Sequence, residues 1–353
     1  MFEELRSKTV AVALSGGVDS AVVAALLREA GCAVIGVTLR LLQDQDCADA
    51  ARIASQLGIP HHFLDSRDLF SETVVEPFLA SYLGGGTPLP CAHCNRRLKF
   101  GALLRFAESL GAERLATGHY ARIVQGAVGA ELHKAAAIGR DQSYFLFGLS
   151  QEQLSNAVFP LGNFSGKAET RAEAARLGLA VAEKPDSQDI CFIPNGDYAG
   201  FVKRLCPEAT RSGEIVDESG RVLGRHEGII NFTVGQRRGL NIHDRTGENN
   251  EPLYVVRIEA ADNRVVVGSY DSLGTRRVVL RDVNWIARAI APHDISVDAK
   301  LRSAQKPVSA RFTLGADGKG YLDFREPVYG VAPGQAGVLY QDTRVLGGGW
   351  IMA

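Results

Sequence analysis

The chain has 353 residues, of which 46% are hydrophobic and 22% are charged, and its formal net charge is −1. This composition is typical of a globular protein with two or three domains, and it excludes both a disordered chain and a globally basic nucleic-acid binder. The apolar runs are shorter than the roughly 18 residues that span a bilayer, and the charged N-terminus differs from a signal peptide, so we expect a cytoplasmic protein.

The first predicted strand, Val10 to Leu14, leads directly into a glycine turn. The turn reads Ser15-Gly16-Gly17-Val18-Asp19-Ser20 and opens a predicted helix that ends near Gly31. In this order of strand, turn and helix, backbone N–H groups and serine hydroxyls point at an anion. Neither the Walker loop nor the dinucleotide-binding pattern is present. The turn resembles the loop of PP-loop pyrophosphatases, which cut ATP between the α and β phosphates; the alternative is an ordinary turn with Ser20 as a helix N-cap.

Strands and helices alternate up to about residue 204. Apolar and periodic segments predict strands over 33–39, 61–64 and 115–117, and helices over 48–57, 70–83 and 99–110. Strict alternation indicates an α/β fold, in which a parallel sheet has helices on both faces and collects ligands at the carboxyl ends of its strands. We therefore expect residues 1–204 to form a catalytic domain with the glycine turn at such an end.

The rest of the chain is rich in short β-branched runs separated by turn residues. Predicted strands cover 221–223, 253–258, 264–267, 278–283, 311–314 and 337–340. This pattern predicts two small β domains, a β-rich one over 205–274 and a β-barrel over 275–353. Residues 276–311 of the barrel carry eight arginines and lysines against three aspartates, which favours either an RNA-binding patch or a solvated surface.

Two segments far apart in the sequence carry candidate reactive thiols. Cys91 and Cys94 follow a glycine and proline loop at the start of a predicted helix. Arg96 and Arg97 come directly after them, and we expect this setting to lower the pKa of Cys94, which makes it a candidate nucleophile or metal ligand. Cys191 precedes an apolar, strand-like run and, taken by itself, is predicted to be a buried core cysteine.

Motifs along the whole chain resemble those of one family, the tRNA-specific 2-thiouridylases. They include the glycine turn, Cys94-Asn95, Lys99-Phe100, Ala116 to Tyr120, Asp141 to Leu146, Ile190 to Ile193, Gly235 to Leu240, Pro333 to Ala336 and Leu346 to Gly349. The resemblance implies ATP-dependent 2-thiolation of the wobble uridine, U34, in the tRNAs for lysine, glutamate and glutamine. ATP with Mg²⁺ would adenylate the uridine O2, and sulfur would then displace AMP.

The resemblance also assigns roles to individual residues. Those matching the family's ATP site are Ala13, Leu14, Ser15, Gly16, Gly17, Val18, Asp19, Ser20, Leu39 and Gly118. Those matching its tRNA contacts are Arg140, Asp141, Gln142, Arg302 and Ser303. Cys191 matches the cysteine that receives a persulfide from a cysteine desulfurase or sulfur-relay protein. Cys94 matches its nucleophilic partner, which attacks the base or resolves the persulfide into a Cys94–Cys191 disulfide, and that bond requires Cα atoms within about 7 Å.

One position departs from the family pattern. Many members have an aspartate, proposed as general acid or base, where this chain has Cys91. Cys91, Cys94 and Cys191 could instead hold a [4Fe-4S] cluster, or Cys91 could resolve the persulfide; zinc would need His93 as a further ligand. The simple thiol pair remains the other possibility.

Two alternative functions, of different classes, would also account for some of these sequence features. A PP-loop ligase would use the glycine turn to activate a carboxylate by adenylation, although it would need neither the two cysteines nor the β-rich half. A non-catalytic RNA-binding protein would retain the turn without using it.

Overall fold

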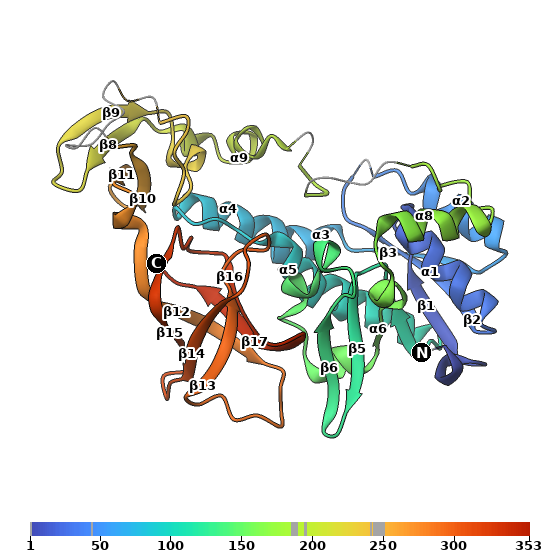
Figure 1. The fold of residues 1–353 in the computed structure, drawn as a ribbon. Helices are drawn as coiled ribbons and strands as arrows, with labels where there is room; N and C mark the ends of the chain where they lie inside the picture. The colour runs from blue at the N-terminus through green and yellow to red at the C-terminus, as the bar shows by residue number, and fades with distance from the viewer. Residues whose placement is uncertain (1, 44, 185–189, 194–195, 241, 243–250) are drawn as a thin grey trace.

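Three β assemblies follow one another along the molecule. The computed structural model describes residues 2–43, 45–184, 190–193, 196–240, 242 and 251–353. Figure 1 shows an α/β part at one end, a barrel in the middle and a small sheet at the other end. No helix in the described chain is long and apolar enough to cross a membrane.

The α/β part is built on a five-stranded sheet, and its strands pair in parallel in the order β3-β2-β1-β4-β7. These strands are β1 (Thr9–Ala13), β2 (Ala33–Arg40), β3 (His61–Asp65), β4 (Arg114–Ala116) and β7 (Ala157–Val158). Alternate residues of β1 face opposite sides of the sheet. Val10 and Val12 pack with α1 (Val18–Glu29), α2 (Ala48–Leu57) and α8 (Lys167–Arg176). Ala11 packs on the other side, with residues 90–109, which we call the cysteine-bearing helical segment because it contains Cys91 and Cys94. The prediction of a parallel sheet with helices on both faces is confirmed.

Turn chemistry sets several element ends where the sequence predicts them. Helix α2 ends at Gly58, which adopts φ 61° and donates its N–H to the carbonyls of Ala54 and Ser55. The predicted helix over 70–83 is a run of three elements, α3 (Arg67–Phe70), η2 (Ser71–Val75, a π-helix) and α4 (Glu76–Leu83).

The cysteine-bearing helical segment begins well before residue 99, where the sequence predicts a helix. It consists of α5 (Pro90–Cys94), η3 (Asn95–Leu103) and α6 (Leu104–Ser109), and η3 is a π-helix. The other helices are α7 (Gln151–Ser155) and α9 (Tyr198–Leu205). Short 3₁₀ turns are η1 (Glu3–Leu5), η4 (Ile138–Arg140), η5 (Ser143–Leu146), η6 (Pro160–Asn163), η8 (Pro207–Thr210), η9 (Ile229–Asn231) and η10 (Asp271–Leu273).

A hairpin inside the α/β part of the sequence belongs spatially with the barrel. Strands β5 (Ala121–Gly126) and β6 (Gly129–Lys134) pair with each other, and His133 of β6 pairs with Arg344 of the last barrel strand. Figure 1 shows the hairpin between the parallel sheet and the barrel. The Arg344–Glu131 ion pair, with a 3.0 Å N–O distance, closes this seam. The hairpin was not predicted from the sequence, because its partner strand lies at the other end of the chain.

The two predicted β units are both present. The small sheet has the order β10-β11-β8-β9 and contains β8 (Gly213–Asp217), β9 (Val222–His226), β10 (Tyr254–Glu259) and β11 (Arg264–Gly268). The barrel contains β12 (Gly274–Trp285), β13 (Ile295–Lys300), β14 (Val308–Leu314), β15 (Gly320–Tyr329), β16 (Ala336–Gln341) and β17 (Arg344–Ile351). Pairing of β12 with both β15 and β17 closes it, as predicted.

Candidate active site

The glycine turn lies at the carboxyl end of β1 and is tied internally by its two serines. Ala13 ends β1, and the Leu14 N–H donates to the carbonyl of Val37 on the neighbouring strand. The Ser20 Oγ accepts from the Ser15 N–H at 3.2 Å and donates to the Gly17 carbonyl at 3.0 Å. Gly17 is the N-cap of α1, and no side chain caps this helix end. The first turn of α1, from Val18 to Ser20, therefore presents its N–H groups beside two hydroxyls, as an anion site requires.

Two lysines that the sequence did not single out meet this turn. The Lys167 Nζ, at the start of α8, donates to Asp19 Oδ1 at 2.8 Å, and the Tyr120 hydroxyl donates to the same oxygen at 3.1 Å. The Lys184 Nζ donates to the Gly16 carbonyl at 3.0 Å and forms an ion pair with Asp49. Both lysines come from segments far along the chain, so no local pattern connects them with the glycine turn.

Leu39 and Gly118 lie at the same edge of the sheet as the turn. Leu39 is the last residue but one of strand β2, and Gly118 follows β4. The strands on both sides of β1 therefore contribute to this edge. A Cβ on Gly118 would lie 2.8 Å from the Asp19 Cβ and 3.2 Å from the Ser20 N. Glycine is required here because the backbone passes this close to the turn. The residues predicted for the ATP site thus all lie at one edge of the sheet, and Gly118 directly contacts the turn.

Cys94 and the segment of Cys191 pack in one hydrophobic cluster. Cys94 ends α5 and is 8% exposed, and it shares the cluster with Phe192 and Ile193. The Phe192 ring makes edge contacts, at centroid distances of 5.3 Å, with three rings from α3, α4 and α9, namely Phe70, Phe78 and Phe201. These contacts hold the turn that carries Cys191 beside the cysteine-bearing helical segment.

The structure corrects the prediction that Cys191 is a buried core cysteine. Cys191 is an exposed residue, in a turn closed by a hydrogen bond from the Ile193 N–H to the Ile190 carbonyl, while the neighbouring Phe192 takes the buried position. Cys91 is also exposed, and Cys94 is the buried member of the three.

Lys99 is the cation that these thiols share. Desolvation by surrounding protein atoms raises the pKa of all three thiols, including Cys91 and Cys191, although these two are exposed as whole residues. The charge of Lys99 lowers each of the three pKa values in part. Burial lowers the pKa of His119, and the charge of Lys99 lowers it further. His119 directly follows Gly118, and its ring lies 5.9 Å from that of Phe100, the residue after Lys99, so the cysteine-bearing helical segment contacts the loop that carries Gly118.

The prediction of a lowered pKa for Cys94 is wrong. Burial raises it to about 11, more than the partial lowering by Lys99 can offset. Arg96 and Arg97 line a hollow of about 480 Å³ against the barrel, together with His93 and Trp350, and Cys94 is not part of its lining. The two arginines are next to Cys94 in the sequence, but in the folded helix their side chains line a hollow against the barrel instead.

The pH dependence of alkylation follows from this burial. Because the thiolate is the reactive form, we expect the rate of Cys94 alkylation by iodoacetamide to rise about tenfold per pH unit from about pH 8 to 10. Lys99→Met should slow the reaction further at each pH, since the charge that favours the thiolate is removed. Peptide mass spectrometry of time points measures both rates. A plateau below about pH 9 would contradict the raised pKa.

The three thiols do not form a ligand set as they lie in this structure. All six cysteines are free, and the described residues include no group of three or more His, Cys, Asp or Glu side chains arranged to hold a metal ion. His93, the one ligand considered for zinc, stacks on Trp350 at 4.3 Å between ring centroids.

The residues that match tRNA contacts are divided between exposed and structural positions. Arg140 and Ser303 are exposed. Asp141 accepts hydrogen bonds from the backbone N–H groups of Ala135 and Ser143, and Gln142 accepts from the Tyr120 N–H at 2.9 Å.

Arg302 joins the barrel to the loop that precedes the small sheet's β10. Its Nη2 donates to the Val234 carbonyl at 2.9 Å and to the Gly330 carbonyl. Much of the basic stretch around it is paired with carboxylates, as in Arg277–Asp323 and Arg311–Asp294. Exposed pairs of this kind contribute little to stability.

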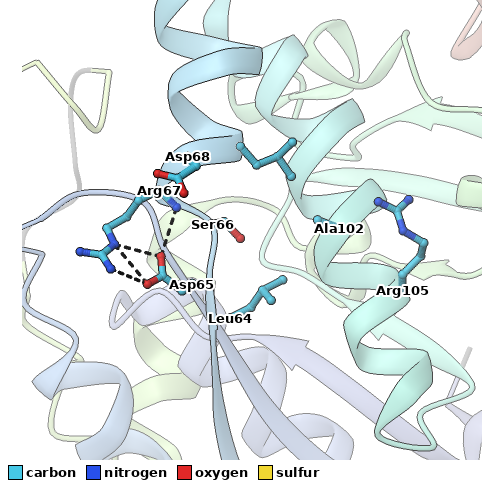
Figure 2. A pocket seen from close by; sticks show the side chains of 8 residues that line it. Leu64, Asp65, Ser66, Arg67, Asp68, Ala102 and Arg105 are labelled. Carbon is cyan, nitrogen blue, oxygen red and sulfur yellow. Dashed lines mark hydrogen bonds and ion pairs between the residues drawn. The ribbon is translucent and has the colours of Figure 1, made fainter.

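A further hollow, of about 560 Å³, lies at the carboxyl end of β3 and contains none of the predicted site residues. Figure 2 shows Arg67 paired with Asp65 on one wall and Arg105 on the other. Since the described chain neutralises Arg67 there, we assign this hollow no part in the chemistry.

The fold and the site define an α/β protein with an anion-binding glycine turn, a cysteine pair and an attached β-barrel. Three family models match in sequence: "tRNA methyl transferase HUP domain" over residues 8–195, "tRNA methyl transferase PRC-barrel domain" over 199–269 and "Aminomethyltransferase beta-barrel domain" over 275–351.

Curated relatives match over nearly the whole chain. The tRNA-specific 2-thiouridylase MnmA of Rhodospirillum centenum is 52% identical over 97% of this chain and 91% of that protein. The proteins of the same name from Paracoccus denitrificans and Rickettsia typhi are 50% and 48% identical, over 97% of this chain and over 91% and 98% of their own lengths. The chain belongs to the tRNA-specific 2-thiouridylase family.

Proposed function

We propose that this enzyme replaces the 2-oxygen of U34 by sulfur in the tRNAs for lysine, glutamate and glutamine, using ATP and a persulfide sulfur. The observation that carries the proposal is that Cys94 packs in one cluster with the Cys191 turn, while Phe100 of the same helical segment contacts His119, which follows Gly118 beside the glycine turn. We assign catalysis to residues 1–204 and tRNA binding to the barrel, 275–353, with 205–274 as the β-rich unit between them. We place the reaction in the cytoplasm, where thiols stay reduced.

ATP makes the uridine oxygen replaceable. The O2 attacks the α-phosphorus, the bond to the β-phosphate breaks, and pyrophosphate leaves, so that the oxygen can later depart as part of AMP. The N–H groups of the first turn of α1, the Ser15 and Ser20 hydroxyls and the Lys167 ammonium are placed to hold the phosphates. Bound Mg²⁺ would neutralise phosphate charge, with Asp19 as the carboxylate at the turn.

The two cysteines then divide the sulfur chemistry. The exposed thiol of Cys191 can be reached by a cysteine desulfurase or relay protein that leaves a persulfide on it. In one route the outer sulfur attacks C2 and AMP leaves; Cys94 thiolate then attacks the Cys191 sulfur, forming a disulfide and leaving the outer sulfur on the base. In the other route the Cys94 thiolate attacks C2 and AMP leaves. Hydrosulfide, freed when an external dithiol reduces the Cys191 persulfide, then attacks C2 and displaces the Cys94 thiolate.

A [4Fe-4S] cluster on Cys91, Cys94 and Cys191 was the alternative sulfur carrier. Because the described residues do not form a metal-ligand group, we derive no step through a cluster. Anaerobic purification with an iron and sulfide count tests this choice: a colourless, fully active protein supports the persulfide route, and a brown one with about four irons supports the cluster.

Pyrophosphate release separates the proposed function from its two alternatives. With ATP and Mg²⁺ present, unmodified tRNA for glutamate should stimulate release, and a mixture of small carboxylic acids should not. Stimulation by acids alone would support the carboxylate ligase. If neither tRNA nor acids stimulated release, the non-catalytic RNA-binding protein, whose glycine turn is unused, would remain.

Arg302 and Ser303 are expected to differ in what they contribute. Arg302→Met leaves the Val234 and Gly330 carbonyls without their donor. We therefore expect the free energy of unfolding to fall by about 1–3 kcal/mol, which a thermal melt reports as a lower Tm. Ser303→Ala, at an exposed position, should leave Tm unchanged, and any loss should appear in tRNA affinity alone. An unchanged Tm for Arg302→Met would contradict the structural role of this side chain, and a tRNA affinity measurement on the same variant would then test its role in binding.

A further inference from the structure

Cys91 has no part in the sulfur transfer described above, yet it is placed to react with Cys94. Both belong to α5, three residues apart, so they lie on one face of the helix. Helix geometry sets their Cα atoms about 5 Å apart, within the range of about 4.4–6.8 Å that a disulfide needs. The two thiols differ in access, because Cys91 is exposed and Cys94 is 8% exposed.

This difference matters after sulfur transfer. The first route ends with a Cys94–Cys191 disulfide, which must be reduced before another persulfide can be loaded. The Cys94 sulfur lies in a hydrophobic cluster with Phe70, Phe78 and Leu98, where an external thiol has little access. An external thiol that attacks the exposed Cys191 instead must expel Cys94, and a buried thiolate with a raised pKa is a slow leaving group. Cys91 needs no path through solvent, since it shares the helix face with Cys94. Negative charge on Cys91 raises the pKa of Cys191, and charge on either raises the pKa of Cys94, which is consistent with three thiols close together.

We propose that Cys91 and Cys94 form a thiol-exchange pair that takes over the disulfide left by sulfur transfer and presents it to an external dithiol reductant. This inference rests on the proposed function. The Cys91 thiolate attacks the Cys94 sulfur, the Cys94–Cys191 bond breaks, and Cys191 leaves as a thiolate ready for the next persulfide. The exchange itself involves no net oxidation. A dithiol then attacks the exposed Cys91 sulfur, takes up the disulfide and returns both cysteines as thiols.

The experiment follows disulfides and turnovers together. Full-length protein loaded with persulfide on Cys191 is mixed with ATP, Mg²⁺ and unmodified tRNA without reductant, alkylated and mapped by mass spectrometry. We expect the unsubstituted protein to carry mainly a Cys91–Cys94 disulfide. Cys91→Ser should retain the first turnover and carry Cys94–Cys191 instead. With a dithiol and a sulfur donor added, its later turnovers should be at least about tenfold slower. Cys206→Ser, at a cysteine outside the three, is the matched control.

The outcomes separate this inference from the function on which it rests. A Cys94–Cys191 disulfide in the unsubstituted protein, with repeated turnover unimpaired in Cys91→Ser, would overturn the exchange pair and leave the thiolation intact. Loss of the first turnover in Cys91→Ser would also overturn it, since Cys91 would then act before the disulfide forms. Absence of 2-thiouridine from the unsubstituted protein would contradict the proposed function itself.

Discussion

Cys94→Ala and Cys191→Ala should each reduce 2-thiouridine formation by on the order of 10³-fold or more, because each removes a sulfur that forms or breaks a bond in the reaction. ATP binding should be retained, since neither thiol belongs to the glycine turn. The measurement is 2-thiouridine in digested tRNA by mass spectrometry, beside ATP affinity by calorimetry.

Stability needs its own control in this experiment. Cys94 packs in the cluster with Phe192, so Cys94→Ala removes buried contacts, whereas Cys191 is exposed. Cys94→Ser keeps the volume and serves as the second variant. Cys206→Ala, which changes a thiol outside the three, should leave thiolation at its original rate. Unimpaired thiolation by either the Cys94 or the Cys191 variant would overturn the site assignment.

Gly16→Ala should abolish ATP-dependent pyrophosphate release, with a loss of about 100-fold or more. Gly16 adopts φ 74°, and its added Cβ would lie 2.9 Å from the Asp49 Cβ and 3.3 Å from the Ala50 N. The turn must shift to relieve this contact. It would then lose the alignment of the Ser15 and Ser20 groups with the first turn of α1.

Gly58→Ala is the matched control for Gly16→Ala. Gly58 also has a positive φ, 61°, but nothing lies within 4 Å of an added Cβ, and it caps the far end of α2. Both variants carry the cost of a left-handed alanine, about 1 kcal/mol, which a thermal melt reports for each. Only Gly16→Ala should lose pyrophosphate release. Equal losses in the two variants would show that the effect is general destabilisation.

The sheet, the barrel and the nucleotide edge could be predicted because their signals are local. Apolar runs bounded by glycine mark β1 and α1, and Gly58 ends α2 by a conformation that glycine adopts at no steric cost. The alternation of strands and helices then fixes a parallel sheet, and the carboxyl ends of parallel strands necessarily share one edge. Leu39, Gly118 and the turn therefore meet at that edge, as expected.

The sequence by itself determined the hydrophobic period of each helix and strand, the turn residues and which residue types are candidates for the reaction. Only the tertiary structure decided that Lys167 and Lys184 meet the glycine turn, that the β5–β6 hairpin extends the barrel, and that Cys191 is exposed while Cys94 is buried. The physical reason is that pKa and access depend on desolvation by neighbours. Those neighbours, Phe192 and the aromatic rings around it, come from segments that no local pattern links to Cys94.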